Sequence, residues 1–134
     1  MNKENIKKLI ETLKGVKYTS DYVYAKSGFN MEVYSHECGT PSCMAGYAAS
    51  EAIGYKNYKI ITEDQGNGDF SHPLAQNWLG LTEDQALILF LPNESDDWNM
   101  FDIKPKHAIK ALEIILKEGK VKSNIWDTVM ENRS

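Results

Sequence analysis

Four of the nine glycines and two of the four prolines divide this chain of 134 residues into short segments. Within these segments apolar side chains recur every three or four residues, the spacing that places them on one face of an α-helix. Glycine often follows the last residue of a helix, and proline fits its first turn or ends it. The residues that divide the chain in this way are Gly15, Gly54, Gly80, Pro92, Pro105 and Gly119. The sequence therefore predicts a mainly α-helical fold with about five to six helices.

Three of the predicted helices carry clear start signals. Asn2 can cap the first helix, and Pro105 fits the first position of a long amphipathic helix. Thr82 and Gln85 form a capping box that opens a third helix. Because residues 86–91 are all apolar, we expect this third helix to be buried on every side at the centre of the core.

Two segments do not follow the helical pattern. Residues 17–35 contain several aromatic and β-branched side chains on both sides of a Ser-Gly pair, and they favour a small β-hairpin or a loop. In residues 55–62, side chains expected to face the core alternate loosely with side chains expected to face solvent, a pattern that favours a strand. No repeat, low-complexity tract or linker interrupts the chain, so we expect residues 1–134 to form a single domain, mainly α and α+β at most.

The formal net charge of the chain is -4 and its isoelectric point is about 5.4. No cluster of Lys and Arg stands out, so direct binding to nucleic acid is not expected. The longest strongly apolar run, residues 86–91, is too short to span a bilayer or to form the core of a signal peptide. We therefore expect a cytoplasmic protein that does not bind membranes and whose acidic surface suits a basic protein partner.

Residues 36–47 hold both cysteines of the chain and one of its three histidines. Thr40 is a suitable N-cap and Pro41 fits the first helical position, which places Cys43 in the first turn of a helix. The dipole and the unpaired amides of this turn are expected to lower the pKa of the Cys43 thiol. With His36 as its base, Cys43 would be the nucleophile of a hydrolase or transferase. The opposing interpretation is that Cys43 is a small buried residue that packs in the core.

A second interpretation of the same residues is a zinc site. Cys38 and Cys43 form a C-x4-C pair, and His36 would supply a third ligand. A structural zinc site usually has a second paired cluster, which this sequence lacks. A reversible disulfide is a third alternative, and burial of both thiols beneath a tight turn is the simplest one. We therefore expect no cofactor, with zinc as the alternative.

The motif and the segments that follow it resemble a group of small, uncharacterised bacterial and phage proteins. The shared pattern is His36-x-Cys38-Gly39-Thr40-x-x-Cys43-x-Ala45-Gly46-x-Ala48, followed by a Leu79-Gly80-Leu81 turn and a Leu89-Phe90 pair. The resemblance covers about residues 28–118. No catalytic residue can be assigned from this resemblance, which implies a phage or mobile-element origin.

Small size, acidic charge and an incomplete catalytic set favour a non-enzymatic binding module over an enzyme. Glu94, Asp96, Asp97 and Trp98 are predicted to form its interaction loop, because an aromatic anchor flanked by acids suits a basic partner. The implied phage origin adds the hypothesis that the chain inhibits a host-defence protein, an inference by association. A cysteine-dependent hydrolase or transferase and a small zinc-binding protein are the alternatives.

Overall fold

The computed structural model describes residues 1–21, 25–36 and 38–131, which contain seven α-helices and one 3-10 helix. In chain order these are α1 (Lys3–Lys14), α2 (Met44–Ile53), α3 (Tyr55–Gln65), α4 (Ser71–Leu79), α5 (Glu83–Phe90), η1 (Met100–Asp102), α6 (Pro105–Glu118) and α7 (Ile125–Glu131). The mainly α-helical class is confirmed, and the described residues hold more helices than the sequence predicted. None of the described helices is long and apolar enough to cross a lipid bilayer.

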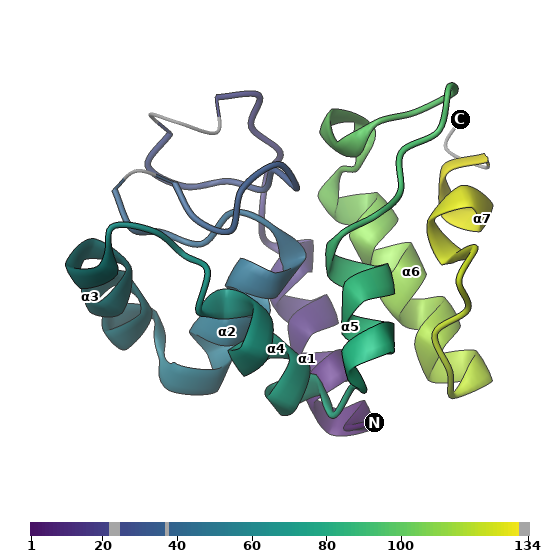
Figure 1. Cartoon of the computed structure of the whole chain (residues 1–134), viewed down its shortest axis with the longest axis horizontal. Coiled ribbons are helices and arrows are strands. Elements are labelled where there is room, and N and C mark those ends of the chain that lie inside the picture. The colour runs from purple at the N-terminus through teal and green to yellow at the C-terminus, as the bar shows by residue number, and fades with distance from the viewer. Residues whose placement is uncertain (22–24, 37, 132–134) are drawn as a thin grey trace.

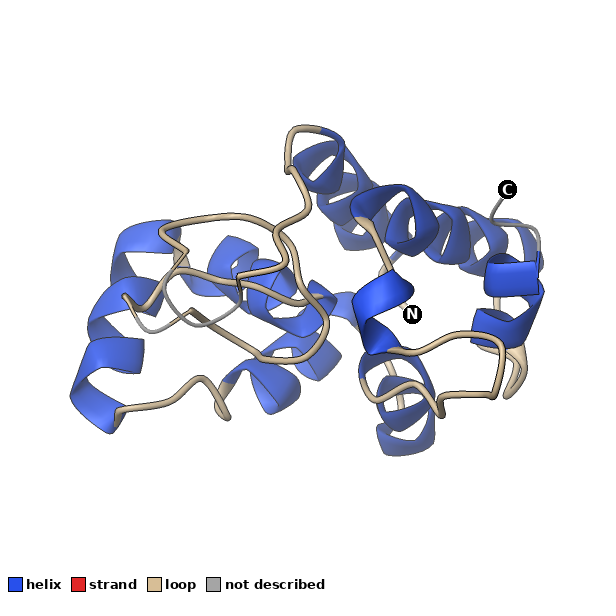
Figure 2. Cartoon of the chain, turned by 90° about the horizontal axis from the view of Figure 1, so that it is seen from above, coloured by secondary structure: helices blue, strands red, loops and turns tan. Residues whose placement is uncertain are grey.

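Helix α1 lies between two groups of helices (Figure 1). On one side, α2 packs mainly against α4 and also contacts α3. On the other side, α6 packs against α1 and α7, while α5 contacts both α4 and α7 and so joins the two groups. The segment of residues 15–43 contains no helix among its described residues and lies on the same side as α2 and α3 (Figures 1 and 2).

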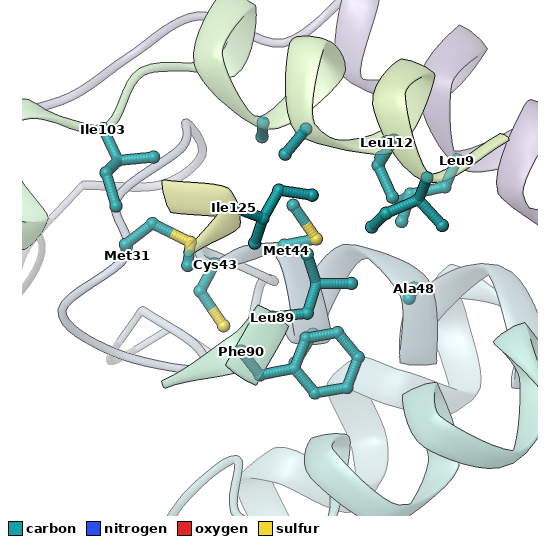
Figure 3. Close-up of a cluster of buried hydrophobic side chains, with 14 of the residues drawn as sticks. Leu9, Met31, Cys43, Met44, Ala48, Leu89, Phe90, Ile103, Leu112 and Ile125 are labelled. Atoms are coloured by element: carbon teal, nitrogen blue, oxygen red, sulfur yellow. The ribbon is translucent and has the colours of Figure 1, made fainter. Parts of the chain in front are cut away.

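One cluster of buried apolar side chains runs through both groups of helices (Figure 3). Helices α1 and α6 supply its most regular part, because their apolar residues recur at helical spacing and the two helices pack together. Their buried apolar residues are Ile6, Leu9, Ile10, Leu13, Ala108, Ala111, Leu112 and Ile115. Full burial of one such leucine or isoleucine is worth about 2 kcal/mol, so the α1–α6 contact contributes strongly to the stability of the fold.

Helix α5 is not the fully buried central helix that its apolar sequence predicts. Leu89 and Phe90 are buried, but Leu87 is 42% exposed and Leu91, just after the helix, is 45% exposed. The reason is that α5 packs mainly against α4 and α7, which leaves one of its sides open. The capping box predicted at its start does form.

The strand predicted for residues 55–62 is wrong, because these residues belong to α3. Tyr58 and Thr62 are one helical turn apart and both are buried, whereas Ile60 is 54% exposed. A four-residue spacing on one helix face thus accounts for the loose alternation of the sequence.

The described part of residues 17–35 does not form a β-hairpin. Tyr18 and Phe29 make an isolated parallel bridge, and Ser35 pairs with Pro41 in the cysteine motif, which we define as residues 36–47. Neither bridge extends into a ladder. Four residues of these segments lie outside the described residues: Tyr22, Val23, Tyr24 and Glu37.

Candidate functional site

The described residues of the cysteine motif before α2 form a turn at residues 38–39 and then a non-helical segment as far as Cys43. The backbone N–H of His36 donates to the carbonyl of Thr40 at 2.8 Å, and the N–H of Ser42 donates to the carbonyl of Tyr34 at 3.0 Å. These bonds hold the chain out of the helical conformation, so that Cys43 is the N-cap of α2. The prediction that Thr40 caps this helix is therefore wrong.

The Cys43 thiol is enclosed in the hydrophobic core. Its side chain is 2% exposed and belongs to the same cluster as Met31 and Met44 (Figure 3). The Gly46 N–H donates a long hydrogen bond to the Cys43 sulfur at 3.5 Å. Burial nevertheless raises the pKa of Cys43 to about 11, because the loss of hydration destabilises the thiolate more than the hydrogen bonds from the helix amides stabilise it. The expected lowering of this pKa is therefore wrong, and Cys43 is a protonated thiol at neutral pH.

His36 is buried and braces the loop beside the motif. Its Nε2 lies 2.7 Å from the carbonyl oxygen of Gly28, an acceptor that requires the proton to be on Nε2. Gly28 has a φ of +115°, and a Cβ at this position would lie 2.9 Å from the Thr19 side chain. Only glycine fits there, so His36 holds a backbone turn that other residues cannot adopt.

Cys38 is half-buried at the edge of the motif. Its Sγ lies 3.3 Å from the Thr40 hydroxyl and 3.6 Å from the carbonyl oxygen of Ala25, and both cysteines are free thiols. Among residues 1–21, 25–36 and 38–131, no three His, Cys, Asp or Glu side chains are grouped as ligands of a metal ion. Zinc binding by His36, Cys38 and Cys43 stays a prediction from the sequence.

A buried polar network ties the loop of residues 17–30 to the cysteine motif. Ser42 Oγ donates to the Asn30 carbonyl at 2.8 Å, and the Asn30 N–H donates to the Ser42 carbonyl at 3.1 Å. The Asn30 side-chain amide donates to the Thr19 carbonyl at 3.0 Å. Asn30 and Ser42 have no solvent exposure, and satisfied buried polar groups of this kind fix one conformation. Sequence reasoning missed both residues, because no spacing signal marks them.

The braced loop forms one wall of a hollow of about 660 Å³, which we call the tyrosine cavity. The other walls are the end of α1 with the residues after it, one side of α2, and the start of α3. Tyr18, Tyr47 and Tyr55 line the cavity, together with Thr40 and Pro41 of the cysteine motif. The motif therefore contributes Thr40, Pro41 and Tyr47 to this hollow.

The predicted interaction loop differs from its expected form at Trp98. This residue is only 4% exposed, and its indole N–H donates to the Asp127 carboxylate at 3.2 Å. Glu94 accepts a backbone N–H from the first residue of η1 at 3.1 Å, while Asp96 and Asp97 are exposed. Trp98 is therefore not an exposed anchor, because it packs in the core with its polar group satisfied. The two aspartates remain accessible as predicted.

Beside this loop lies a groove of about 380 Å³, which we call the tryptophan groove. Its lining consists of Leu87, Ile88, Leu91, Asn93, Trp98, Ser123, Trp126 and Asp127. The Trp126 indole N–H donates to the Leu89 carbonyl at 3.0 Å, so hydrogen bonds orient both tryptophans. Trp98 and Trp126 are buried, whereas Leu87 and Leu91 are exposed beside them. Sequence reasoning missed the groove because these two leucines were expected to lie in the core.

Comparison with protein-family models, with curated proteins and with solved structures finds no match for this chain. The functional argument therefore depends on the two hollows and on the cysteine motif. Of the residues predicted for a site, the structure brings Trp98 into a groove with residues of α5 and α7. It places Cys43 and His36 inside the fold, where each makes a hydrogen bond with the backbone.

Proposed function

We propose that this chain is a non-enzymatic protein-binding module whose tryptophan groove holds an apolar side chain from a basic segment of its partner. The observation that carries this proposal is the exposure of Leu87 and Leu91 at the groove. Single exposed leucines are common on protein surfaces. Two leucines one helical turn apart, beside two buried tryptophans, instead place apolar side chains together in a lining that also contains Asn93, Ser123 and Asp127. Grooves that bind an amphipathic helix take up its apolar side chains at positions of this kind.

Carboxylates lie around these leucines. Asp127 is part of the lining, and Asp96 and Asp97 are exposed on the adjoining loop. Glu83 and Asp84 are exposed one helical turn before Leu87 on α5. No Lys, Arg or His is among the described residues that line the groove. The groove therefore favours a partner segment that carries Lys or Arg next to its apolar side chains.

One lysine lies close to the groove in the sequence. Lys122 precedes Ser123 of the lining, and its ammonium nitrogen lies 3.2 Å from the Glu118 carboxylate. This carboxylate offsets part of the positive charge at the edge of the groove. The local charge therefore stays acidic, in agreement with the net charge of -4 for the whole chain.

The alternative of a cysteine-dependent hydrolase or transferase has less support. A nucleophilic cysteine needs a thiolate and a path to the substrate. Cys43 is 2% exposed, and burial raises its pKa to about 11. His36, the expected base, makes a short hydrogen bond with the Gly28 carbonyl. These contacts favour a role for the motif in holding the fold together.

The phage or mobile-element origin implied by the motif extends the proposal to one class of partner. A module that binds without catalysis acts by occupying a surface that its partner needs for another purpose. We therefore propose a host-defence protein as the partner and inhibition as the result, an extension that depends on the resemblance and not on the groove. The identity of the captured protein tests this extension separately from the binding site.

The test of the binding site is photo-crosslinking from the whole chain. A photoreactive amino acid replaces Leu91 in one variant and Ile60 in the control, because Ile60 is also apolar and exposed but lies on α3, on the opposite side of the molecule (Figure 1). In a lysate of its native cells, we expect one protein to be crosslinked from position 91 and not from position 60. The crosslinked peptide should carry Lys or Arg within about one helical turn of the attached residue. Equal crosslinking from both positions, or none from position 91, would contradict the proposal.

A further inference from the structure

The tyrosine cavity lies apart from the tryptophan groove, and its walls have a different chemistry. Tyr18, Tyr47 and Tyr55 contribute aromatic rings, while Glu51 and Lys17 contribute one charge each. Four further side chains carry hydroxyl groups: Thr12, Ser27, Thr40 and Ser50. Aromatic surfaces combined with a few polar groups are the usual composition of a site for a small molecule. The volume of about 660 Å³ also falls within the range of such sites.

Several contacts hold the aromatic walls in place before any ligand binds. The ring of Tyr47 stacks on buried Phe29 with 6.4 Å between the ring centroids. The Lys104 ammonium group lies 5.6 Å from the centroid of the Tyr18 ring, on its face. The turn at Gly28, which is part of the same wall, is fixed by its hydrogen bond with His36. A site whose walls are ordered in advance loses less conformational entropy on binding.

The polar groups of the cavity are suited to hydroxyl groups on a ligand. The Tyr47 phenol is protonated at physiological pH and can donate a hydrogen bond, and burial raises its pKa further, to about 12. Glu51 is exposed at the cavity edge, and its Oε1 accepts a hydrogen bond from the Thr12 hydroxyl, which orients the carboxylate. A carboxylate fixed in this way can accept hydrogen bonds from neighbouring hydroxyls, as an acidic residue does with ribose in dinucleotide-binding folds.

The charged groups of the lining favour an uncharged ligand. One carboxylate, Glu51, and one ammonium group, Lys17, balance each other among the lining residues. The lining therefore carries no net formal charge, so the ligand is expected to be uncharged.

We propose that the tyrosine cavity binds an uncharged ring compound that carries a vicinal diol, the chemistry shared by ribonucleosides and monosaccharides. Tyr55, which is 56% exposed at the mouth of the cavity, provides the surface on which the ring stacks. Glu51 accepts hydrogen bonds from the diol. The cysteine motif has a part in this site through Thr40, Pro41 and Tyr47, which gives its buried hydrogen-bond network a use as the support of a binding wall.

The experiment titrates the full chain with adenosine, 2′-deoxyadenosine and methyl glucoside at up to millimolar concentration and follows the tyrosine signals by NMR. The variants are Tyr55→Ala and Glu51→Gln, with Glu113→Gln as the control because Glu113 is exposed on α6, outside the lining. Tyr55 and Glu51 are exposed, so both variants should fold. Loss of one stacked ring is expected to weaken binding about tenfold, and loss of the carboxylate by a similar factor. The control should bind as the unchanged chain does.

The three probes distinguish the two sources of the diol. Adenosine binding that weakens with 2′-deoxyadenosine supports the proposal with a nucleoside as the ligand, and binding of methyl glucoside alone supports it with a sugar. The absence of binding by all three probes overturns the proposal. So does binding that both cavity variants leave unchanged. None of these outcomes depends on the crosslinking from Leu91, so the cavity and the protein-binding proposals can fail separately.

Discussion

The cysteine motif and the tryptophan groove both gather side chains that suggest a function, but they use them in opposite ways. In the motif, Cys43, His36 and Ser42 are buried, and their side chains form hydrogen bonds with backbone groups of α2 and of the adjoining loop. At the groove, Leu87 and Leu91 are apolar residues that the fold leaves exposed. The comparison shows that reactive residue types can mark a place where the backbone must be held. The exposed side chains at the groove are instead two leucines, which carry no reactive group.

The packing of the two regions explains this difference. Helix α2 has small residues in its first turns, and the carbonyl of Tyr34 approaches it so closely that a Cβ on Gly46 would lie 2.2 Å from the carbonyl oxygen. The backbone of Tyr34 therefore packs directly against the start of α2. Helix α5 instead packs mainly against α4 and α7, so its remaining side is open to a partner.

The largest expected effect is on the free energy of unfolding, and it distinguishes the buried residues of the groove from the exposed ones. Trp98→Ala should lower the free energy of unfolding by about 3–5 kcal/mol, because it removes a buried aromatic ring. Leu91→Ala should change it by less than about 1 kcal/mol, because this side chain is 45% exposed. Urea unfolding at neutral pH measures both. A stable Trp98→Ala variant would mean that this tryptophan is the exposed anchor that the sequence predicted.

The close approach at α2 gives the next effect. Gly46→Ala should destabilise the fold by about 3 kcal/mol or prevent folding, since the new methyl group would overlap the Tyr34 carbonyl. The matched control is Gly15→Ala, where the nearest atom would lie 3.7 Å from the new Cβ and the φ is -94°. Thermal unfolding of both variants makes the comparison. Similar stability of the two would show that the loop does not close over α2 as described.

The pKa of Cys43 predicts a loss of stability at high pH. Below pH 9.0 the thiol is protonated in both the folded and the unfolded chain. Between pH 9.0 and about 11 the unfolded chain loses this proton first, so the folded state is destabilised as the pH rises. The two-unit difference corresponds to about 3 kcal/mol across this window. Cys43→Ala should therefore show a smaller loss of stability in urea unfolding between about pH 8 and pH 11.

Tyr47 and Tyr58 titrate over an overlapping range, since burial raises the pKa of both phenols. Both tyrosines are present in the variant as well, so the difference between the two chains reports the thiol together with the effect of its charge on these two phenols. Equal slopes with and without Cys43 would show that its environment is not the dry core described above.

The smallest expected effect is in the chemical labelling of the two cysteines. Iodoacetamide near neutral pH should modify half-buried Cys38 first, and should reach Cys43 only when denaturant opens the core. Peptide mapping by mass spectrometry after a series of labelling times measures the order. Rapid labelling of Cys43 in the folded chain would restore the nucleophile interpretation.

Signals that act within one helix were the ones that the sequence could predict. Asn2 caps α1, the capping box at Thr82 opens α5, and Pro105 begins α6, because each depends only on neighbouring residues. The predicted start of α2 was wrong because the backbone hydrogen bonds from His36 to Thr40 and from Ser42 to Tyr34 form outside a helix, so that α2 begins only after Cys43. The pKa of Cys43 was wrong for a related reason, since burial depends on what packs around the helix end.

The groove could not be predicted from the sequence, again because it depends on how the helices pack. The apolar run in α5 contains both buried Leu89 and exposed Leu87, and nothing local distinguishes them. Which side of α5 is open depends on the positions of α4 and α7, which are fixed by tertiary packing. The aspartates of the interaction loop could be predicted because charged residues are rarely buried.

The most direct test compares two variants of the whole chain in their binding to the protein captured from position 91. Leu91→Glu places a charge in the apolar surface of the groove, whereas Cys43→Ala removes the thiol of the motif. The account predicts that Leu91→Glu raises the Kd by at least about tenfold and that Cys43→Ala, once shown to be folded by circular dichroism, binds as the unchanged chain does. Loss of binding with Cys43→Ala and full binding with Leu91→Glu would contradict it and return the function to the cysteine motif.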